Sequence, residues 1–145
     1  MGEAYFMKKT VPEYINVGNQ PVVIAELELT GGSYAVTAKF DVAPFNPTDP
    51  ESGLASFTLT FAGVSDKINC TPGFAHNRAN NDWDVPTNEA VCLTVAGSAP
   101  PQDVVHGVVT PAPTAVLACT LRNQRLRIEN ITLTAIGVDS IHAVT

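Results

Sequence analysis

Four residues in the longest polar stretch of the chain are the best local candidates for a site: His76, Asp82, Trp83 and Asp84. Carboxylate oxygens could bind calcium, and the indole of Trp83 could stack on a sugar ring. The acidic residues do not follow the spacing of a calcium-binding loop, and Asn and Asp are common in loops because they hydrogen-bond to nearby backbone. We therefore interpret these four residues as a candidate recognition loop and predict no bound metal.

The remaining residues do not suggest a catalytic apparatus. His106 lies in the segment 103–109, on the same alternating face as Val104 and Val108, where a lone histidine is typical of a core or a subunit contact. No serine has the setting of a nucleophile elbow, no glycine-rich phosphate loop follows a strand pattern, and the acidic residues are scattered through turns. We predict that the protein is not an enzyme and has no cofactor.

The three cysteines, Cys70, Cys92 and Cys119, form no CxxC pair and no zinc-type cluster with histidine. Cys92 and Cys119 both lie in strand-like segments. We expect buried, unreactive thiols, and a Cys92–Cys119 bridge across neighbouring strands is the alternative.

The composition limits the partners of the protein. The 145 residues include only eight Lys and Arg against 14 Asp and Glu, and the net charge is −6, so we expect no binding to nucleic acid. No apolar run approaches the roughly 20 residues of a membrane span, and the N-terminus lacks the order of a secretory signal. We expect a soluble chain that is made in a cytoplasm and does not bind a membrane.

Alternating apolar and polar residues dominate the sequence. From Ser33 onward the apolar residues fall on every second position, as in a half-buried strand, and the Gly31–Gly32 pair before it is typical of a hairpin turn. We therefore predict a hairpin between residues 22–29 and 33–42. The side chains expected inside the fold are Tyr34, Val36, Phe40, Phe57, Leu59, Phe61 and Leu133.

The same pattern predicts further strands, separated by turns and loops. Residues 71–88 form the longest expected loop, residues 96–101 a turn, and residues 129–130 a bulge because the apolar face shifts there. About eight to ten short strands at this spacing indicate an all-β fold, a single antiparallel β-sandwich of the jelly-roll kind. The further predicted strands cover residues 54–61, 67–70, 89–95, 102–109, 114–121, 125–128 and 131–138.

Residues 1–20 show no clear period but contain the large apolar side chains Tyr5, Phe6, Met7 and Tyr14. Two interpretations are equally open. The segment is an arm that packs on a partner, with these four residues as the candidate partner contact, or it is the first edge strand of the domain. The sandwich domain itself is expected over residues 21–145.

Three segments of the sequence resemble one group of proteins: residues 29–40 (LTGGSYAVTAKF), 118–121 (ACTL) and 133–141 (LTAIGVDSI). The group consists of small proteins from actinobacteria and their tailed phages, which are similar to the trimeric jelly rolls of tumour necrosis factor and complement globular heads. The resemblance covers about residues 22–141, and the chain departs from it at Cys92–Leu93 and in its long 71–88 loop. It implies a homotrimer that binds or caps, without catalytic residues.

These observations together favour a virion component made in a host bacterium. The leading expectation is a phage capsid decoration protein that binds the shell as a trimer, with capsid or other virion proteins as partners. A phage tail or fibre-tip protein and a bacterial surface carbohydrate-binding module are the alternatives.

Overall fold

The fold is known from a computed structural model. It describes residues 3–16, 18–45, 54–70, 75–77, 82–85, 89–100, 104–109, 112–122 and 125–142.

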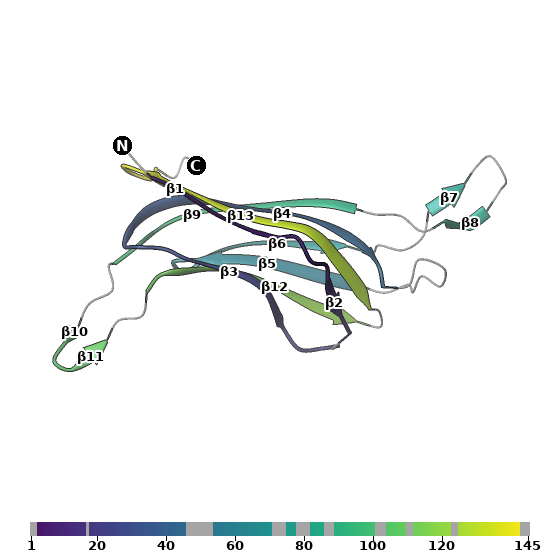
Figure 1. The fold of residues 1–145 in the computed structure, drawn as a ribbon, viewed down its shortest axis with the longest axis horizontal. Helices are drawn as coiled ribbons and strands as arrows, with labels where there is room; N and C mark the ends of the chain where they lie inside the picture. The colour runs from purple at the N-terminus through teal and green to yellow at the C-terminus, as the bar shows by residue number, and fades with distance from the viewer. Residues whose placement is uncertain are drawn as a thin grey trace.

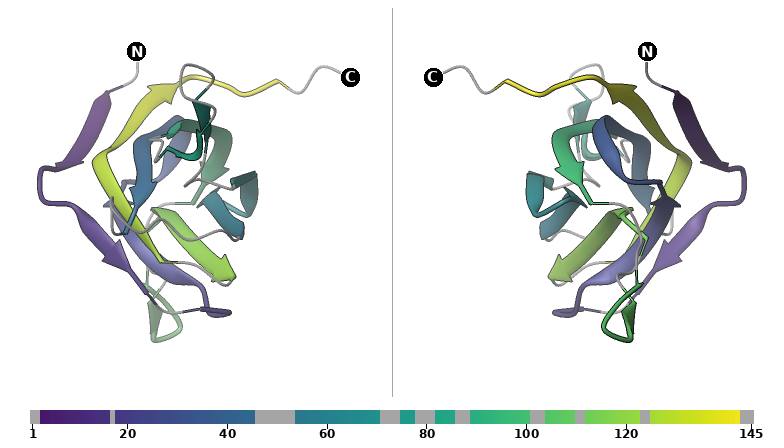
Figure 2. Two further views of the ribbon diagram at one scale, coloured as in Figure 1. Left: turned by 90° about the vertical axis from the view of Figure 1, so that its right-hand side faces the viewer. Right: turned by 90° about the vertical axis from the view of Figure 1, so that its left-hand side faces the viewer.

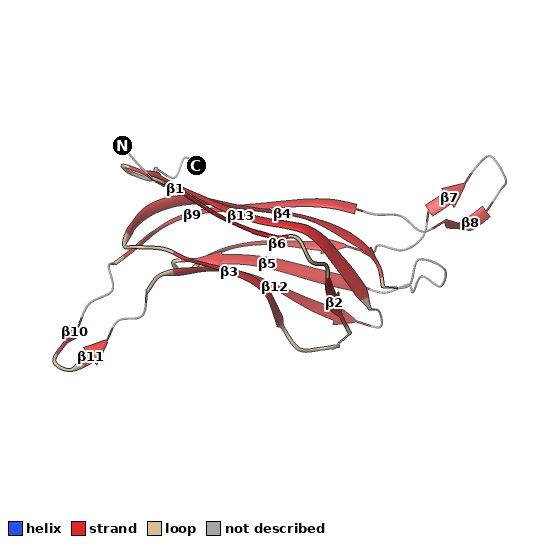
Figure 3. Cartoon of the chain, viewed as in Figure 1, coloured by secondary structure: helices blue, strands red, loops and turns tan. Residues whose placement is uncertain are grey.

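Two antiparallel sheets stacked face to face form the body of the molecule (Figure 1). The described residues contain strands and connecting turns but no helix (Figure 3). The expected antiparallel β-sandwich is therefore confirmed. Sheet A holds, in spatial order, β1 (Ala4–Lys9), β13 (Leu126–Val138), β4 (Gly32–Pro44) and β9 (Glu89–Ala99), and β2 (Glu13–Ile15) also pairs with β13. Sheet B holds β3 (Val22–Glu28), β12 (Thr114–Arg122), β5 (Leu54–Phe61) and β6 (Val64–Cys70).

The strands of the two sheets pair from the ends of the chain inward. Strand β1 pairs with β13, β3 with β12, β4 with β9, and β5 with β6, each antiparallel. Because successive pairs belong alternately to sheet A and sheet B, the chain wraps around the sandwich as a double-sheet jelly roll.

The core lies between the two sheets and is made by the inward positions of each strand. Phe40 of sheet A meets Phe57 of sheet B with 4.8 Å between ring centroids, and Tyr34 meets Phe61 at 5.8 Å. Period-2 alternation therefore identified the buried face correctly. All the side chains that the sequence placed inside are buried: Tyr34, Val36, Phe40, Phe57, Leu59, Phe61 and Leu133.

The predicted hairpin between residues 22–29 and 33–42 is wrong. Strand β3 belongs to sheet B and β4 to sheet A, so the chain between them crosses from one sheet to the other. Gly32 has a φ of 142° at this crossing, and the Leu29 amide donates to the Pro113 carbonyl at 2.7 Å, which extends the β3–β12 ladder. Both strands bury an apolar side by facing each other across the core, and alternation cannot distinguish this arrangement from a hairpin.

Strand β9 continues through Ala99, where the sequence predicted a turn at 96–101. Gly97 explains the difference. A Cβ at this position would lie 3.1 Å from the Ala62 Cβ and 3.2 Å from the Phe61 carbonyl oxygen, so the glycine permits close packing of β9 on the β5–β6 turn. It therefore marks a close contact and not the end of a strand.

The segment predicted as one strand over 102–109 is a small hairpin of β10 (Val104–Val105) and β11 (Val108–Val109). His106 and Gly107 form its turn with φ values of 52° and 78°, as in the type I′ turns that favour tight hairpins. His106 is exposed, so a place in the core is wrong, and the alternative of a subunit contact stays a prediction.

The predicted bulge at residues 129–130 is confirmed. The register between β13 and β4 shifts between Glu129 and Thr132, so that two residues of β13 lie opposite one residue of β4. Asn130 adopts a φ of 53° in the bulge and donates from Nδ2 to Asp41 Oδ2 at 2.8 Å. A positive φ is tolerated by Asn more readily than by most residues.

Side chains bridge the two sheets on both open sides of the sandwich. On one side Lys9 of sheet A donates from Nζ to the Ile24 carbonyl of edge strand β3 at 2.5 Å. On the other side Asp66 of sheet B accepts from the Thr94 amide of edge strand β9 at 3.1 Å. We call these two contacts the edge clasps. They occupy main-chain groups that an edge strand otherwise leaves open to another chain.

Candidate interaction surface

The structure divides the four candidate contact residues of the N-terminal segment between two faces. Tyr5 and Met7 point inward from β1 and pack against the core, whereas Phe6 is 74% exposed and Tyr14, on β2, is 55% exposed. Ile15, which follows Tyr14, is buried in the core. Tyr5, Met7 and Ile15 therefore contribute to the core of the domain, as the edge-strand interpretation of this segment expects.

Tyr5 and Tyr34 form an aromatic contact at one end of the sandwich, with 6.0 Å between ring centroids. The Tyr5 hydroxyl donates to a Glu3 carboxylate oxygen, and this hydrogen bond is the main reason that the pKa of Tyr5 is raised. The Tyr34 hydroxyl lies 2.8 Å from that of Thr30. The contact between Tyr5 and Tyr34 packs β1 against the body of the domain.

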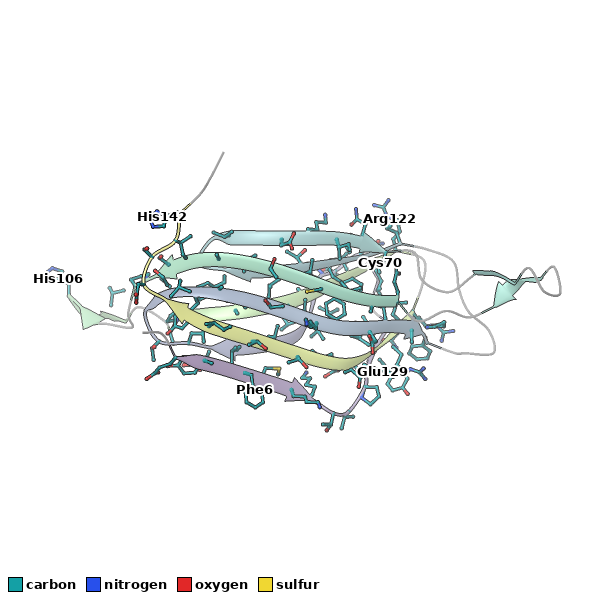
Figure 4. All side chains as sticks on the ribbon, turned by 90° about the horizontal axis from the view of Figure 1, so that it is seen from above. Phe6, Cys70, His106, Arg122, Glu129 and His142 are labelled. Atoms are coloured by element: carbon teal, nitrogen blue, oxygen red, sulfur yellow. The ribbon has the colours of Figure 1, made fainter. Side chains whose placement is uncertain are left out.

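The outer face of sheet A is formed by side chains aligned across four strands. Phe6 faces Thr134 of β13, which faces Thr37 of β4, which faces Thr94 of β9. The next row is entirely apolar and includes Ile136, which is 52% exposed. We call this uncharged surface the Phe6 face, and its members are Ala4, Phe6, Ala35, Thr37, Thr94, Ala96, Thr134 and Ile136. Figure 4 looks onto this side of the sheet, with Phe6 on the edge strand β1.

Charged residues border the Phe6 face on one side. Lys8 and Lys39 lie in the next row, and the bulge with Asp41 and Asn130 follows. A hollow of about 330 Å³ opens beside the bulge, between Lys39, Asp41, Asn130 and Cys92. The uncharged surface is therefore adjacent to a shallow hollow, lined by both apolar and charged residues, that a partner side chain could enter.

Aromatic and cationic groups gather beyond the bulge at the same outer face. The rings of Tyr14 and Phe45 meet edge to face at 5.4 Å, and the Arg125 guanidinium lies 4.6 Å from the Phe45 ring centroid. Arg127, which pairs with Tyr14 across the strands, forms an ion pair from Nε to Glu129. Tyr14 is thus fixed by its own domain more than Phe6 is.

The candidate recognition residues lie on a short hairpin and not on an irregular loop. Strands β7 (Ala75–Asn77) and β8 (Asp82–Val85) pair within the connection from β6 to β9 and project from one end of the sandwich (Figure 1). The β10–β11 hairpin projects from the opposite end, and Val108 near its tip is 68% exposed. The backbone of His76, Asp82, Trp83 and Asp84 is therefore placed, but their side chains lie outside the described part of the structure.

The cysteines offer one accessible thiol and two buried ones. Burial raises the pKa of Cys70 to about 11 and that of Cys119 to about 12, so both remain protonated thiols at neutral pH. Cys92 is exposed on the outside of sheet A, while Cys119 points into the core from sheet B. The alternative Cys92–Cys119 bridge is therefore wrong, and so is the expectation that Cys92 is buried.

Within the described ranges, no group of three His, Cys, Asp or Glu side chains is arranged to hold a metal ion. The described part of the chain also contains no helix long and apolar enough to cross a membrane.

Sequence reasoning missed most of the Phe6 face. Ile136 was assigned only to a terminal strand, and Val11, which is 74% exposed beside β1, was not considered. The available signal was Ile136 itself, an apolar residue out of phase with the buried Leu133 and Ala135. The threonine and alanine neighbours give no local signal, because they become one surface only through strand pairing.

Comparison with known proteins shows the fold. No family model and no curated protein matches the sequence, so nothing supports the resemblance to small actinobacterial and phage proteins at the level of sequence. The structure is similar to a chain in the structure of infectious bursal disease virus Gx strain, with a TM-score of 0.53 and 8% identity. The similarity covers 97% of this chain and 32% of that chain, so this protein spans about a third of the length of the chain it matches.

Proposed function

We propose that this protein is a non-enzymatic structural component of a virus particle. More specifically, we propose a capsid decoration protein that docks on the shell through the Phe6 face. The Phe6 face is the observation that carries the proposal, because an uncharged surface that exposes the large apolar side chains of Phe6 and Ile136 is typical of a contact with another protein. The jelly-roll topology and the likeness to a chain in a virus structure support it, since double-sheet jelly rolls recur in viral capsid proteins.

The finer parts of the proposal come from the sequence. The resemblance to phage proteins favours a tailed phage as the source and a homotrimer as the assembled state. The hollow beside the bulge would add polar contacts next to the apolar ones, as in the rim of a protein interface.

The first test is the protein content of purified particles. Particles isolated from the organism whose genome encodes this chain should contain it in a fixed ratio to the main shell protein, measured by quantitative mass spectrometry. Absence of the chain from such particles would overturn the proposed function.

The second test locates the docking surface with two matched substitutions. Ile136→Glu places a carboxylate on the Phe6 face, and Val23→Glu places one on the outer face of sheet B, where Val23 is 53% exposed against 52% for Ile136. Burying an unpaired charge is costly, so Ile136→Glu should lower occupancy on particles at least about tenfold. Val23→Glu should bind as the unchanged protein does. Equal binding by both variants would show that another surface docks.

A further inference from the structure

Strand β1 is an edge of sheet A with one side unoccupied by any described strand. Figure 2 shows β1 and β2 as the outermost elements on their side of the sandwich. The Gly137 amide donates to the Glu3 carbonyl at 2.7 Å, so the main-chain groups of residue 3 point toward β13. These groups alternate along an antiparallel strand, and those of Ala4, Phe6 and Lys8 therefore point away from the sheet.

Edge strands β3 and β9 each have a main-chain group bonded to a charged side chain. The edge clasps place Lys9 on the Ile24 carbonyl of β3 and Asp66 on the Thr94 amide of β9. Such charged side chains at an edge discourage pairing with another chain. Strand β1 carries Lys8 and Lys9 toward one end, but the exposed ring of Phe6 lies at its centre.

We propose that β1 pairs with β1 of a second copy of this chain, antiparallel, about a two-fold axis at Phe6. Pairing at this register brings the outward main-chain groups together, with Phe6 opposite Phe6 and Ala4 opposite Lys8 of the other copy. The copies then exchange hydrogen bonds at each of these positions, as hydrogen-bonded pairs of an antiparallel ladder do. The side chains agree with the same register.

Three kinds of side-chain contact form across the axis. The two Phe6 rings meet on the outer face, and cross-strand aromatic pairs are favourable. Tyr5 lies opposite Met7 of the other copy on the inner side, a favourable contact between a ring and a thioether. Glu3 lies opposite Lys9, so opposite charges pair at both ends of the contact.

Neighbouring registers lose this complementarity. A shift of two residues in one direction places Glu3 opposite Met7, and a shift in the other places Lys8 opposite Phe6. Lys9 can serve the pairing because its ammonium has three donors, of which one contacts Glu13 Oε1 at 2.6 Å and one the Ile24 carbonyl.

The contact goes beyond the proposed function, because it is a property of the protein alone. It joins the sheet A edges of two copies and brings their Phe6 faces together as one continuous surface. A two-fold contact is compatible with the proposed three-fold one, since a two-fold axis that crosses the three-fold axis at a right angle generates a hexamer of dihedral symmetry.

Cross-linking tests the register in purified protein. In a Cys92→Ser background, Phe6→Cys should be joined to a second copy by a short bifunctional thiol reagent, because paired residues lie about 5.5 Å apart at Cα.

Ala4→Cys and Lys8→Cys are the controls on the same face of β1. Neither should cross-link alone, since its counterpart lies four residues along the strand, about 13 Å away. A mixture of these two variants should cross-link. Equal cross-linking at all three positions would overturn the register.

A proline substitution tests the pairing itself. Lys8→Pro removes an amide that points away from β13, so the β1–β13 ladder is retained. Each copy loses the hydrogen bond from its residue 8 to Ala4 of the other copy, so the contact loses two hydrogen bonds in total. The dissociation constant of the pair should rise about tenfold or more, measured by sedimentation, while Lys8→Ala should change it much less. The unchanged protein should contain two or six copies. A monomer or trimer at tens of micromolar protein, or equal association of the two Lys8 variants, would overturn the proposal even if the protein is found in particles.

Discussion

At the scale of single residues, the side of the strand on which a side chain lies determines its role. Phe6 and Phe57 are the same residue type in strands of similar pattern, yet Phe57 is fully buried against Phe40 while Phe6 is 74% exposed. The first stabilises the fold, and the second is available to a partner. In the same way, Cys70 and Cys119 are buried, whereas Cys92 is exposed.

The two phenylalanines should separate stability from association. Phe57→Ala leaves a cavity in the core and should lower the free energy of unfolding by about 3–5 kcal/mol. Phe6→Ala should change it by less than about 0.5 kcal/mol in monomeric protein, because the ring contributes little to the core. Urea unfolding followed by circular dichroism measures both. A large loss with Phe6→Ala would mean that the ring supports the fold.

The thiols should differ in reactivity and make stability depend on alkaline pH. At pH 7.5 in native conditions, iodoacetamide should modify Cys92 and leave Cys70 and Cys119 unmodified, as judged by mass spectrometry. Folding raises the pKa of Cys70 and Cys119 from 9.0 to about 11 and about 12. The stabilisation from keeping them protonated is complete below about pH 9 and is lost as the pH rises through 11 to 12.

Replacing both buried cysteines by alanine provides the control for this pH dependence. The double variant should lose less stability between pH 8 and pH 11 than the unchanged protein loses. Equal losses in the two proteins would assign the alkaline effect to other groups.

At the scale of elements, the strand edges distinguish this sandwich. Two edges carry a clasp from the opposite sheet, and the N-terminal strands β1 and β2 complete sheet A by pairing with different parts of β13. The N-terminal segment is therefore part of the domain, even though it also carries the exposed Phe6.

Removing a clasp should weaken the fold and open an edge. Asp66→Ala deletes the acceptor of the Thr94 amide and should lower the free energy of unfolding by about 1 kcal/mol. It should also increase self-association, measured by light scattering at high protein concentration, because the β9 edge becomes open. Lys67→Ala, at the exposed neighbouring position, is the matched control. The clasp would be irrelevant if the two variants behaved alike.

Deleting residues 2–15 should prevent stable folding. The deletion removes the β1 and β2 ladders to β13 together with the buried Ile15 and the inward side chains Tyr5 and Met7. We expect loss of the cooperative thermal transition in circular dichroism. A truncated protein that melts within about 5 °C of the full chain would show that the segment is an appended arm, since one kcal/mol corresponds to several degrees in a domain of this size.

At the scale of the whole molecule, the topology brings the two ends of the chain together. Strand β1 pairs with β13 and β3 with β12, so the ladders join residues that are far apart in sequence. Each such ladder requires the closure of a long loop before its contacts can form.

This topology predicts slow, cooperative folding. Refolding from urea should take milliseconds to seconds, as for other folds dominated by non-local pairing, and both sheets should form in one transition because they share a core. Stopped-flow circular dichroism measures the rate. Phe57→Ala in sheet B and Leu133→Ala in sheet A should shift the same unfolding transition. Two separate transitions would contradict a single cooperative core.

The sequence by itself determined most of the long strands and the apolar residues that they bury. Alternation is a local property with a period of two, so it identified residues 54–61 as a strand and placed Tyr34, Phe40 and Leu133 inside. It also located the bulge after Glu129, because a change of phase is visible along one strand.

Only the tertiary structure decided which strands are neighbours. The same alternation fits a hairpin and a crossing between sheets, which is why β3 and β4 were wrongly paired, and a glycine fits a turn and a close contact equally well, as at Gly97. The Phe6 face could not be predicted for the same reason. Its members come from β1, β13, β4 and β9, and they become one surface only through hydrogen bonds between segments far apart in the chain.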